Sequence, residues 1–244
     1  GHRVRLWEAS DRLGGLLRTA SAAPTFDGFG TFLDWQERRV RSLGVDVRLR
    51  MRVEVDDVLA EAPDIVVVAT GTAPRRPGVP GDDLPFVHDV RHVLDGSAPV
   101  TGRVVVVAQD DHVAPLAVAD HLAGLGHDVT IVYATLGPAP LLSRYAIGGF
   151  LARLETLGVR IRTSEQVARI DPGEVLTRRV YSQRPGDPIP ADTVVLACGG
   201  VPQGDLAVRL RGRVPAVHVV GDAFAPRRQI YATREAYALV AGME

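Results

Sequence analysis

The chain has 244 residues, enough for one large domain or two ordinary ones, since domains usually run about 100 to 200 residues. Hydrophobic residues make up 46% and charged residues 23%, a globular composition that excludes disorder and fibrous repeats. The formal net charge is -1, and the 28 basic and 29 acidic residues are spread along the chain, so no basic footprint for nucleic acid or anionic lipid is present.

The first predicted element is a strand at residues 1–7, an apolar alternation entered from a Gly-His turn. An amphipathic helix at residues 30–43 follows and stops at a glycine, after which a strand runs to residue 48. A continuous apolar run at residues 63–71 closes this first set of elements. Because the chain opens at Gly1 with no initiator Met and no targeting pattern, we expect it to begin within a longer fold.

The same signatures return in the same order in the second half, which indicates an internal repeat. The repeat starts with an additional strand and helix, and its predicted elements are residues 103–107, 114–125, 126–132, 146–157, 157–162 and 191–199. Continuous apolar runs such as residues 63–71 and 191–199 suit parallel strands that are buried on both faces. Strands that alternate with helices predict a doubly wound α/β sheet.

The first copy lacks the opening strand and helix of the second. The missing piece would lie just upstream of Gly1, where the Gly-rich phosphate loop of a dinucleotide-binding unit belongs. We therefore predict two Rossmann-like dinucleotide-binding domains of the glutathione-reductase type, the second inserted in the first, with the first truncated at its N-terminal strand and Gly-rich loop. The predicted domains are residues 1–97 plus 203–244, and the inserted residues 98–202, with a Pro- and Gly-rich linker at residues 74–81.

Three groups of residues in the first copy are candidates for binding a nucleotide. Glu8 stands at the end of the first strand, where a carboxylate can accept hydrogen bonds from both ribose hydroxyls of an adenosine group. A solvated carboxylate is the plainer interpretation of an isolated Glu, but Gly14 and Gly15 follow it. Paired glycines let the backbone approach a ligand that a side chain would exclude, and this favours a binding role.

The second group is Ala69, Thr70 and Gly71, which close the apolar run of the first copy. Their small side chains let a cofactor lie across the carboxyl end of the sheet, the usual ligand crevice of such folds. A tight turn without a ligand is the alternative when this triplet is taken alone.

The third group lies near the end of the chain, where a predicted strand at residues 217–220 terminates in Gly221 and Asp222. A helix from about Arg228 to Val240 follows, and its free amides and partial positive charge can face a phosphate. Asp222 can accept a hydrogen bond from a ribityl or ribose hydroxyl. An ordinary loop carboxylate is the alternative, but the three groups together are more specific than any one.

The order of these motifs resembles flavoproteins with two dinucleotide-binding domains. Within them the chain is most similar to the C-terminal portion of the trimethylamine dehydrogenase, histamine dehydrogenase and 2,4-dienoyl-CoA reductase family, the old yellow enzyme-like NADH:flavin oxidoreductases. The resemblance covers essentially the whole chain, and residues 221–227 are closest to the amine-dehydrogenase branch. It implies FAD or ADP on this chain, and FMN and an iron-sulfur cluster in an upstream barrel domain. This fragment would then carry no catalytic residue and be inactive alone.

The second copy is not expected to bind a nicotinamide. No glycine follows its first strand, and Asp110 and Asp111 stand where phosphate would sit. Like charges about 4 Å apart repel by roughly 4 kcal/mol at an effective dielectric near 20. Tyr133 replaces the carboxylate that would correspond to Glu8. The amine-dehydrogenase branch is similarly degenerate here, and the resemblance implies that it passes electrons to an electron-transfer flavoprotein.

Three functions remain open at this point. The chain is part of a flavin-dependent oxidoreductase that oxidises an amine or reduces an enone-like substrate, or it is a non-catalytic ADP-binding scaffold that docks an electron-transfer partner. The third alternative, a portion of an NAD(P)H-dependent enoate or dienoyl-CoA reductase, is disfavoured by Asp110, Asp111 and Tyr133. We expect this chain by itself to bind flavin weakly or not at all.

No metal site or membrane span is predicted. His88 and His92 are four residues apart and could share one helix face, but no third ligand accompanies them. The single cysteine, Cys198, excludes an internal disulfide and a cysteine-ligated cluster built by this chain alone, and it fits a reducing, cytoplasmic location. The longest apolar stretches are far below the roughly 20 residues that a membrane span needs.

Overall fold

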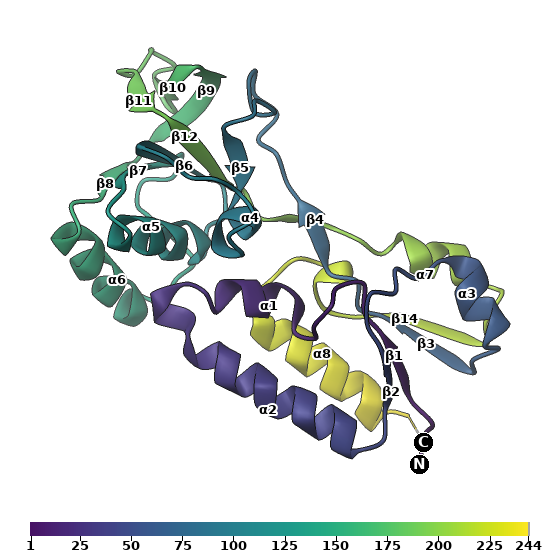
Figure 1. The fold of residues 1–244 in the computed structure, drawn as a ribbon. Helices are drawn as coiled ribbons and strands as arrows, with labels where there is room; N and C mark the ends of the chain where they lie inside the picture. Colours follow the sequence, from purple (N-terminus) through teal and green to yellow (C-terminus); the bar gives the residue numbers. More distant parts are fainter. Residues whose placement is uncertain (244) are drawn as a thin grey trace. The chain divides into compact units, whose positions relative to one another are not determined.

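The computed structural model describes residues 1–243 and has an α/β fold, as the sequence predicts (Figure 1). The chain divides into two compact units. The first unit comprises residues 1–15, 33–75 and 200 onward, and the second comprises residues 16–32 and 76–199.

The second unit is built on a five-stranded parallel sheet whose strand order is β5-β12-β6-β7-β8. The strands are β5 (Val87–Asp89), β6 (Arg103–Ala108), β7 (Asp128–Tyr133), β8 (Arg160–Arg162) and β12 (Thr193–Ala197). The valines of β6 alternate between two cores, because successive side chains of a strand point to opposite faces. Val104 and Val106 pack into one core, whereas Val105 and Val107 pack into the other.

Different elements cover the two faces of this sheet. Helices cover one face, and their buried residues share a core with β6 and β7: α4 (Val90–Leu94), α5 (Ala114–Gly124) and α6 (Arg144–Thr156). A three-stranded antiparallel sheet covers the other face, made of β9 (Glu165–Asp171), β10 (Gly173–Arg179) and β11 (Ile189–Ala191). Figure 1 shows α5 and β9–β11 on opposite sides of the sheet. The short segments α1 (Gly15–Ala20) and η1 (Pro24–Phe26) precede α2 (Gly28–Ser42).

The first unit contains three two-stranded ladders. Two are parallel, β1-β2 and β14-β3, and one is antiparallel, β13-β4. Their bounds are β1 (Arg5–Trp7), β2 (Asp46–Arg48), β3 (Ile65–Val68), β4 (Thr72–Pro74), β13 (Gly200–Pro202) and β14 (Ala216–Val219). A small core joins α3 (Val55–Ala60) to α7 (Asp205–Leu210). The unit ends with η2 (Gly221–Ala223) and α8 (Gln229–Ala241).

The predicted helices and parallel strands are present, with ends that differ by a few residues. Gly44 and Gly158 take positive φ values of 73° and 74° directly after α2 and α6, as predicted for glycine C-caps. The antiparallel sheet β9–β11 was not predicted, because its strands lie between two repeat signatures and carry many charged residues.

One prediction is wrong. Residues 63–71 do not form a strand that is buried on both faces, since Ile65 and Val67 in β3 are 37% and 45% exposed. The possibility that His88 and His92 share a helix face does not hold, because His88 lies in β5 and His92 in α4. Asp89, the last residue of β5, caps that helix.

Within residues 1–243, no helix combines the length and the apolar character that crossing a bilayer demands. The same residues contain no group of three or more His, Cys, Asp or Glu side chains that could hold a metal ion.

Candidate functional site

Two of the three candidate groups meet at the carboxyl end of the β3-β14 ladder. The two strands are parallel and in register from Ile65 opposite Ala216, and the Val220 amide donates to the Val68 carbonyl over 3.1 Å. The turns that follow them, residues 69–71 and 220–222, therefore begin side by side. This is the edge of a parallel sheet at which ligands usually bind.

The first turn is fixed by the segment that returns from the second unit. The hydroxyl of Thr70 donates to the carbonyl of Gln203, and the Gln203 amide donates to the Gly71 carbonyl over 3.0 Å. Gly71 has a φ of 69°, a left-handed conformation that favours glycine. Ala69 and Thr70 are exposed, so this turn presents backbone and small side chains to solvent.

The second turn is held by Glu235, a residue that the sequence reasoning missed. Its carboxylate accepts a hydrogen bond from the Gly221 amide over 2.8 Å and forms an ion pair with Arg227. Gly221 has a φ of 63°, and a Cβ there would lie 3.2 Å from the Cβ of Ala232. Gly221 is therefore required both by its conformation and by the close approach of α8. A sequence signal for Glu235 does exist. It is an acidic residue about two turns into α8, after a Gly-Asp turn and Arg227.

Asp222 and the start of α8 place a carboxylate beside a helix N-terminus. Asp222 Oδ1 accepts from the Arg227 amide over 3.2 Å. The helix has no side-chain cap at Arg228 and no acidic residue in its first turn. The Tyr231 amide donates to the Arg228 carbonyl, which leaves the amides of Gln229 and Ile230 to face an anion. Arg227 and Arg228 lie 5.0 and 5.6 Å from the ring centre of Tyr231, and a hydrogen bond from Arg228 lowers the pKa of that phenol. This end of α8 is electropositive.

The third group lies on the β1-β2 ladder. Glu8 directly follows β1, and its Oε1 accepts from both the amide and the hydroxyl of Ser10, over 2.8 and 2.6 Å. Its Oε2 accepts no hydrogen bond from residues 1–243, so it is free to bind a hydroxyl. Gly14 and Gly15 have φ values of 120° and 49°, and nothing lies within 4 Å of a Cβ built on Gly15. No strand pairing among the described residues joins β1 to β3, so the structure brings the other two groups together but does not link Glu8 to them by a ladder.

In the second unit, the segment after β6 is where the repeat predicts a phosphate-binding loop, and its backbone amides are bonded within the protein. After β6, the amides of Gln109 and Asp110 both donate to the Ala197 carbonyl over 3.0 Å, and the His112 amide donates to Asp110 Oδ1 over 2.8 Å. These are the amides that would otherwise face a phosphate. Tyr133 is 1% exposed, and burial raises the pKa of its phenol. The counterpart of Glu8 is therefore a core residue.

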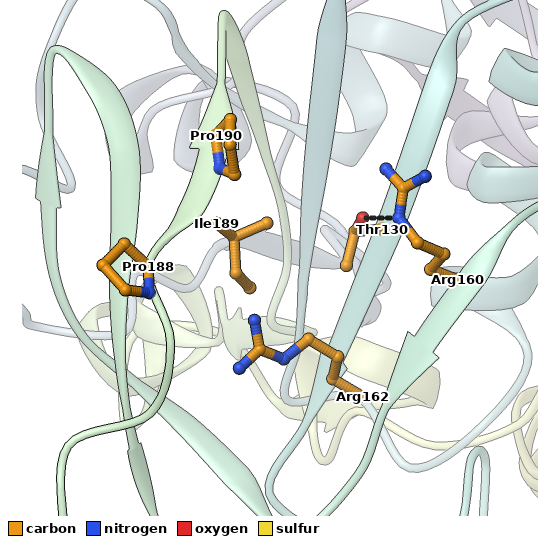
Figure 2. Close-up of a pocket in the computed structure, with 6 residues that line it drawn as sticks. All are labelled: Thr130, Arg160, Arg162, Pro188, Ile189 and Pro190. Atoms are coloured by element: carbon orange, nitrogen blue, oxygen red, sulfur yellow. Dashed lines mark hydrogen bonds between the residues drawn. The ribbon is translucent and has the colours of Figure 1, made fainter.

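The second unit also contains a hollow of about 350 Å³ between β7, β8 and the segment at Pro188–Pro190 (Figure 2). Two arginines line it, but both are already paired. Arg160 binds Asp128 over 2.6 Å and Thr130 over 3.1 Å, whereas Arg162 binds Glu165 over 2.7 Å. Because both guanidinium groups already bind carboxylates, and Arg179 shares Glu165 with Arg162, the hollow is a weak candidate for an anionic ligand.

Comparisons with known proteins agree with the fold. Residues 43–233 match the family model described as pyridine nucleotide-disulphide oxidoreductase. The chain is 32% identical over 227 residues to an NADH oxidase of Thermoanaerobacter brockii, covering 92% of this chain and 35% of that protein. It is 24% identical to a dimethylamine dehydrogenase of Hyphomicrobium over 287 residues, covering 100% of this chain and 39% of that protein.

Among solved structures, the histamine dehydrogenase of Rhizobium sp. 4-9 has a TM-score of 0.88 at 25% identity, covering 100% of this chain and 40% of that one. The resemblance found in the sequence motifs is thus confirmed. The chain spans well under half of the length of each of these relatives.

Proposed function

Because the chain belongs to the pyridine nucleotide-disulphide oxidoreductase family, we propose that it is the nucleotide-binding, C-terminal portion of a flavin-dependent oxidoreductase. The observation that carries the proposal is the meeting of residues 69–71 with Gly221 and Asp222 at the carboxyl end of β3 and β14, beside the uncapped start of α8. The ligand is FAD or ADP, and the domain that holds it corresponds to residues 1–97 plus 203–244.

The residues fit such a ligand chemically. Glu8 Oε2 and Asp222 can accept from ribose or ribityl hydroxyls, while Gly14, Gly15 and the first amides of α8 can face phosphate oxygens. A bound FAD would supply two-electron redox chemistry. The part of this chain is to bind and orient the nucleotide, since none of its described residues is assigned a catalytic role.

The substrate would be handled outside this chain. We propose an upstream barrel domain that carries FMN and an iron-sulfur cluster, and an electron-transfer flavoprotein as acceptor. The relatives named as amine dehydrogenases support oxidation of an amine as the reaction. The buried thiol of Cys198 is compatible with the reducing, cytoplasmic compartment that we propose.

The relative named as an NADH oxidase favours a second candidate, in which the parent enzyme accepts hydride from NADH. The inserted residues 98–202 would then have to bind the NADH. The amides of Gln109 and Asp110 and the burial of Tyr133 argue against that site. A third candidate is a non-catalytic scaffold that holds ADP and docks an electron-transfer partner. Release of colourless ADP would favour the scaffold, whereas release of yellow FAD would favour a redox role.

The test is the nucleotide released by heating the natural polypeptide that contains this chain, identified by chromatography and absorption. We expect one equivalent of FAD or ADP, lost in Asp222→Ala and Glu8→Ala and retained in the matched second-unit variant Asp110→Ala. Saturable NADH binding that depends on the second unit, with no nucleotide released from the first, would overturn the proposal.

A further inference from the structure

A short stretch of the chain leaves the first unit and packs within the second. Residues 16–32, which we call the strap, belong to the second unit, although residues 1–15 and 33–75 on either side of them belong to the first. The strap contains most of α1, all of η1 and the start of α2. It directly follows Gly14 and Gly15, so the chain leads from two candidate nucleotide-binding residues straight into a segment that the second unit holds.

Asp120 on α5 holds the strap through a buried hydrogen bond. This carboxylate is 0% exposed, on a helix whose other buried residues are apolar. The Thr25 hydroxyl donates to its Oδ2 over 3.3 Å, and Arg153 of α6 donates through Nε to its Oδ1 over 2.6 Å. A buried carboxylate is costly unless its oxygens are matched, so Asp120 requires the partner that the strap supplies.

Apolar contacts hold the same part of the strap. Phe26 packs on Phe150 of α6, with ring centres 6.2 Å apart, and stacks on Phe29 with ring centres 5.6 Å apart. Ala23 directly precedes η1 and is 1% exposed. Aromatic pairs at these distances attract each other in addition to the burial of their surface. Polar and apolar contacts therefore both fix residues 23–26 within the second unit.

The glycine turn ahead of the strap has little of its own to fix it. Gly14 and Gly15 take positive φ values of 120° and 49°, and a Cβ built on Gly15 would meet nothing within 4 Å. The upstream end of this segment is tied to the first unit, since the Arg50 amide donates to the Ser10 carbonyl over 2.8 Å. Because glycine has the greatest backbone freedom, the conformation of the turn depends on the attachments at its two ends.

We propose that Thr25 and Phe26 are positioning residues for the nucleotide site, with Asp120 as their anchor. By holding the strap, they fix the turn at Gly14 and Gly15 in the conformation that faces the phosphates. This inference rests on the proposed function, which assigns that turn to the nucleotide. The coupling is reciprocal, because linked equilibria affect each other equally. Release of the strap weakens nucleotide binding, and bound nucleotide strengthens the attachment of the strap.

The test is a calorimetric titration of the natural polypeptide that contains this chain, freed of nucleotide, with ADP, the part that both candidate ligands share. Thr25→Val removes the hydroxyl and keeps the shape of the side chain, whereas Phe26→Ala removes the ring contacts. We expect the Kd for ADP to rise by about fivefold or more in each variant, as for ordinary coupling between two sites. Thr156→Val is the matched control, because that hydroxyl donates to the Ala152 carbonyl within α6, and it should leave the Kd unchanged.

Hydrogen exchange distinguishes positioning from loss of the fold. Saturating ADP should slow the exchange of the amides of residues 16–26 in the natural polypeptide. Both strap variants should exchange faster there, while residues 104–107 of β6 stay protected. Equal Kd values in the natural polypeptide and the strap variants would overturn this inference and leave the proposed function intact. A natural polypeptide that binds neither ADP nor FAD would overturn both.

Discussion

Strands β3 and β12 have nearly the same apolar sequence and opposite burial. Every residue of β12 is buried, whereas in β3 only Val68 is. The difference lies in their neighbours, because β12 pairs with β5 and β6 and is covered on both faces, while β3 pairs with β14 alone. A continuous apolar run identifies a strand that can be buried on both faces, and the strands on either side decide whether it is.

The largest expected effect compares Val195 in β12 with its counterpart Val67 in β3. Val195→Asp places an unpaired carboxylate in a closed core and lowers the free energy of unfolding of the second unit by about 4 kcal/mol or more. Val67→Asp, at 45% exposure, costs about 1 kcal/mol or less. Urea unfolding followed by circular dichroism measures both.

If Val195→Asp does not fold, alanine variants make the same comparison. We expect Val195→Ala to lower the free energy of unfolding by about 2 kcal/mol and Val67→Ala to lower it by less than about 1 kcal/mol. Equal costs at the two positions would mean that β3 is as well covered as β12.

The next effect compares two glycines with positive φ. A Cβ at Gly81, in the second unit, would lie 2.0 Å from the Ile170 carbonyl oxygen, whereas nothing lies within 4 Å of a Cβ at Gly44 in the first unit. Gly44→Ala therefore lowers the free energy of unfolding by about 1 to 2 kcal/mol, through the left-handed conformation alone. Gly81→Ala adds a backbone clash, and we expect a loss of about 3 kcal/mol. Thermal unfolding of both variants measures the difference, and equal losses would contradict it.

A smaller effect concerns Glu235, which holds the Gly221 turn. Glu235→Ala removes the acceptor for the Gly221 amide and the partner of Arg227, at a cost of about 1 kcal/mol after allowance for the partial exposure of the site. Glu235→Gln keeps an acceptor and is the matched control. We expect nucleotide occupancy of the natural polypeptide to fall more in the alanine variant. Equal occupancy in both would show that the turn does not need this contact.

The sequence predicted most of the second unit because each of its elements carries its own signal. The glycine after α6 ends that helix, and the consecutive valines of β6 are typical of a buried strand. It did not predict β9–β11, where Arg169, Arg178 and Arg179 interrupt any apolar alternation. Those strands are amphipathic, and one face alone packs on the sheet, so tertiary contact decided their structure.

Candidate site residues were predictable where glycine or a strand end marked them, as at Gly71 and Gly221. Glu235 was not, since its role depends on α8 folding back so that a residue 14 positions away reaches the Gly221 amide. The grouping of Glu8 with Asp222 stays a prediction, because no ladder among the described residues joins β1 to β3.

The smallest effect concerns Asp64 and Asp192, which directly precede β3 and β12. Hydrogen bonds from Arg103 hold the pKa of Asp192 below its ordinary value, so the folded state binds fewer protons than the unfolded state in acid. The stabilisation is complete above the unfolded pKa of about 3.9 and is lost as the pH falls below it. Asp192→Asn should therefore lower the urea midpoint at pH 7 and have a diminishing effect toward pH 3. Asp64→Asn is the matched control, because no guanidinium binds Asp64 in the part of the chain that the structure describes. If Asp192→Asn lowers the urea midpoint equally at both pH values, Arg103 stabilises the fold through its hydrogen bonds and not through its charge.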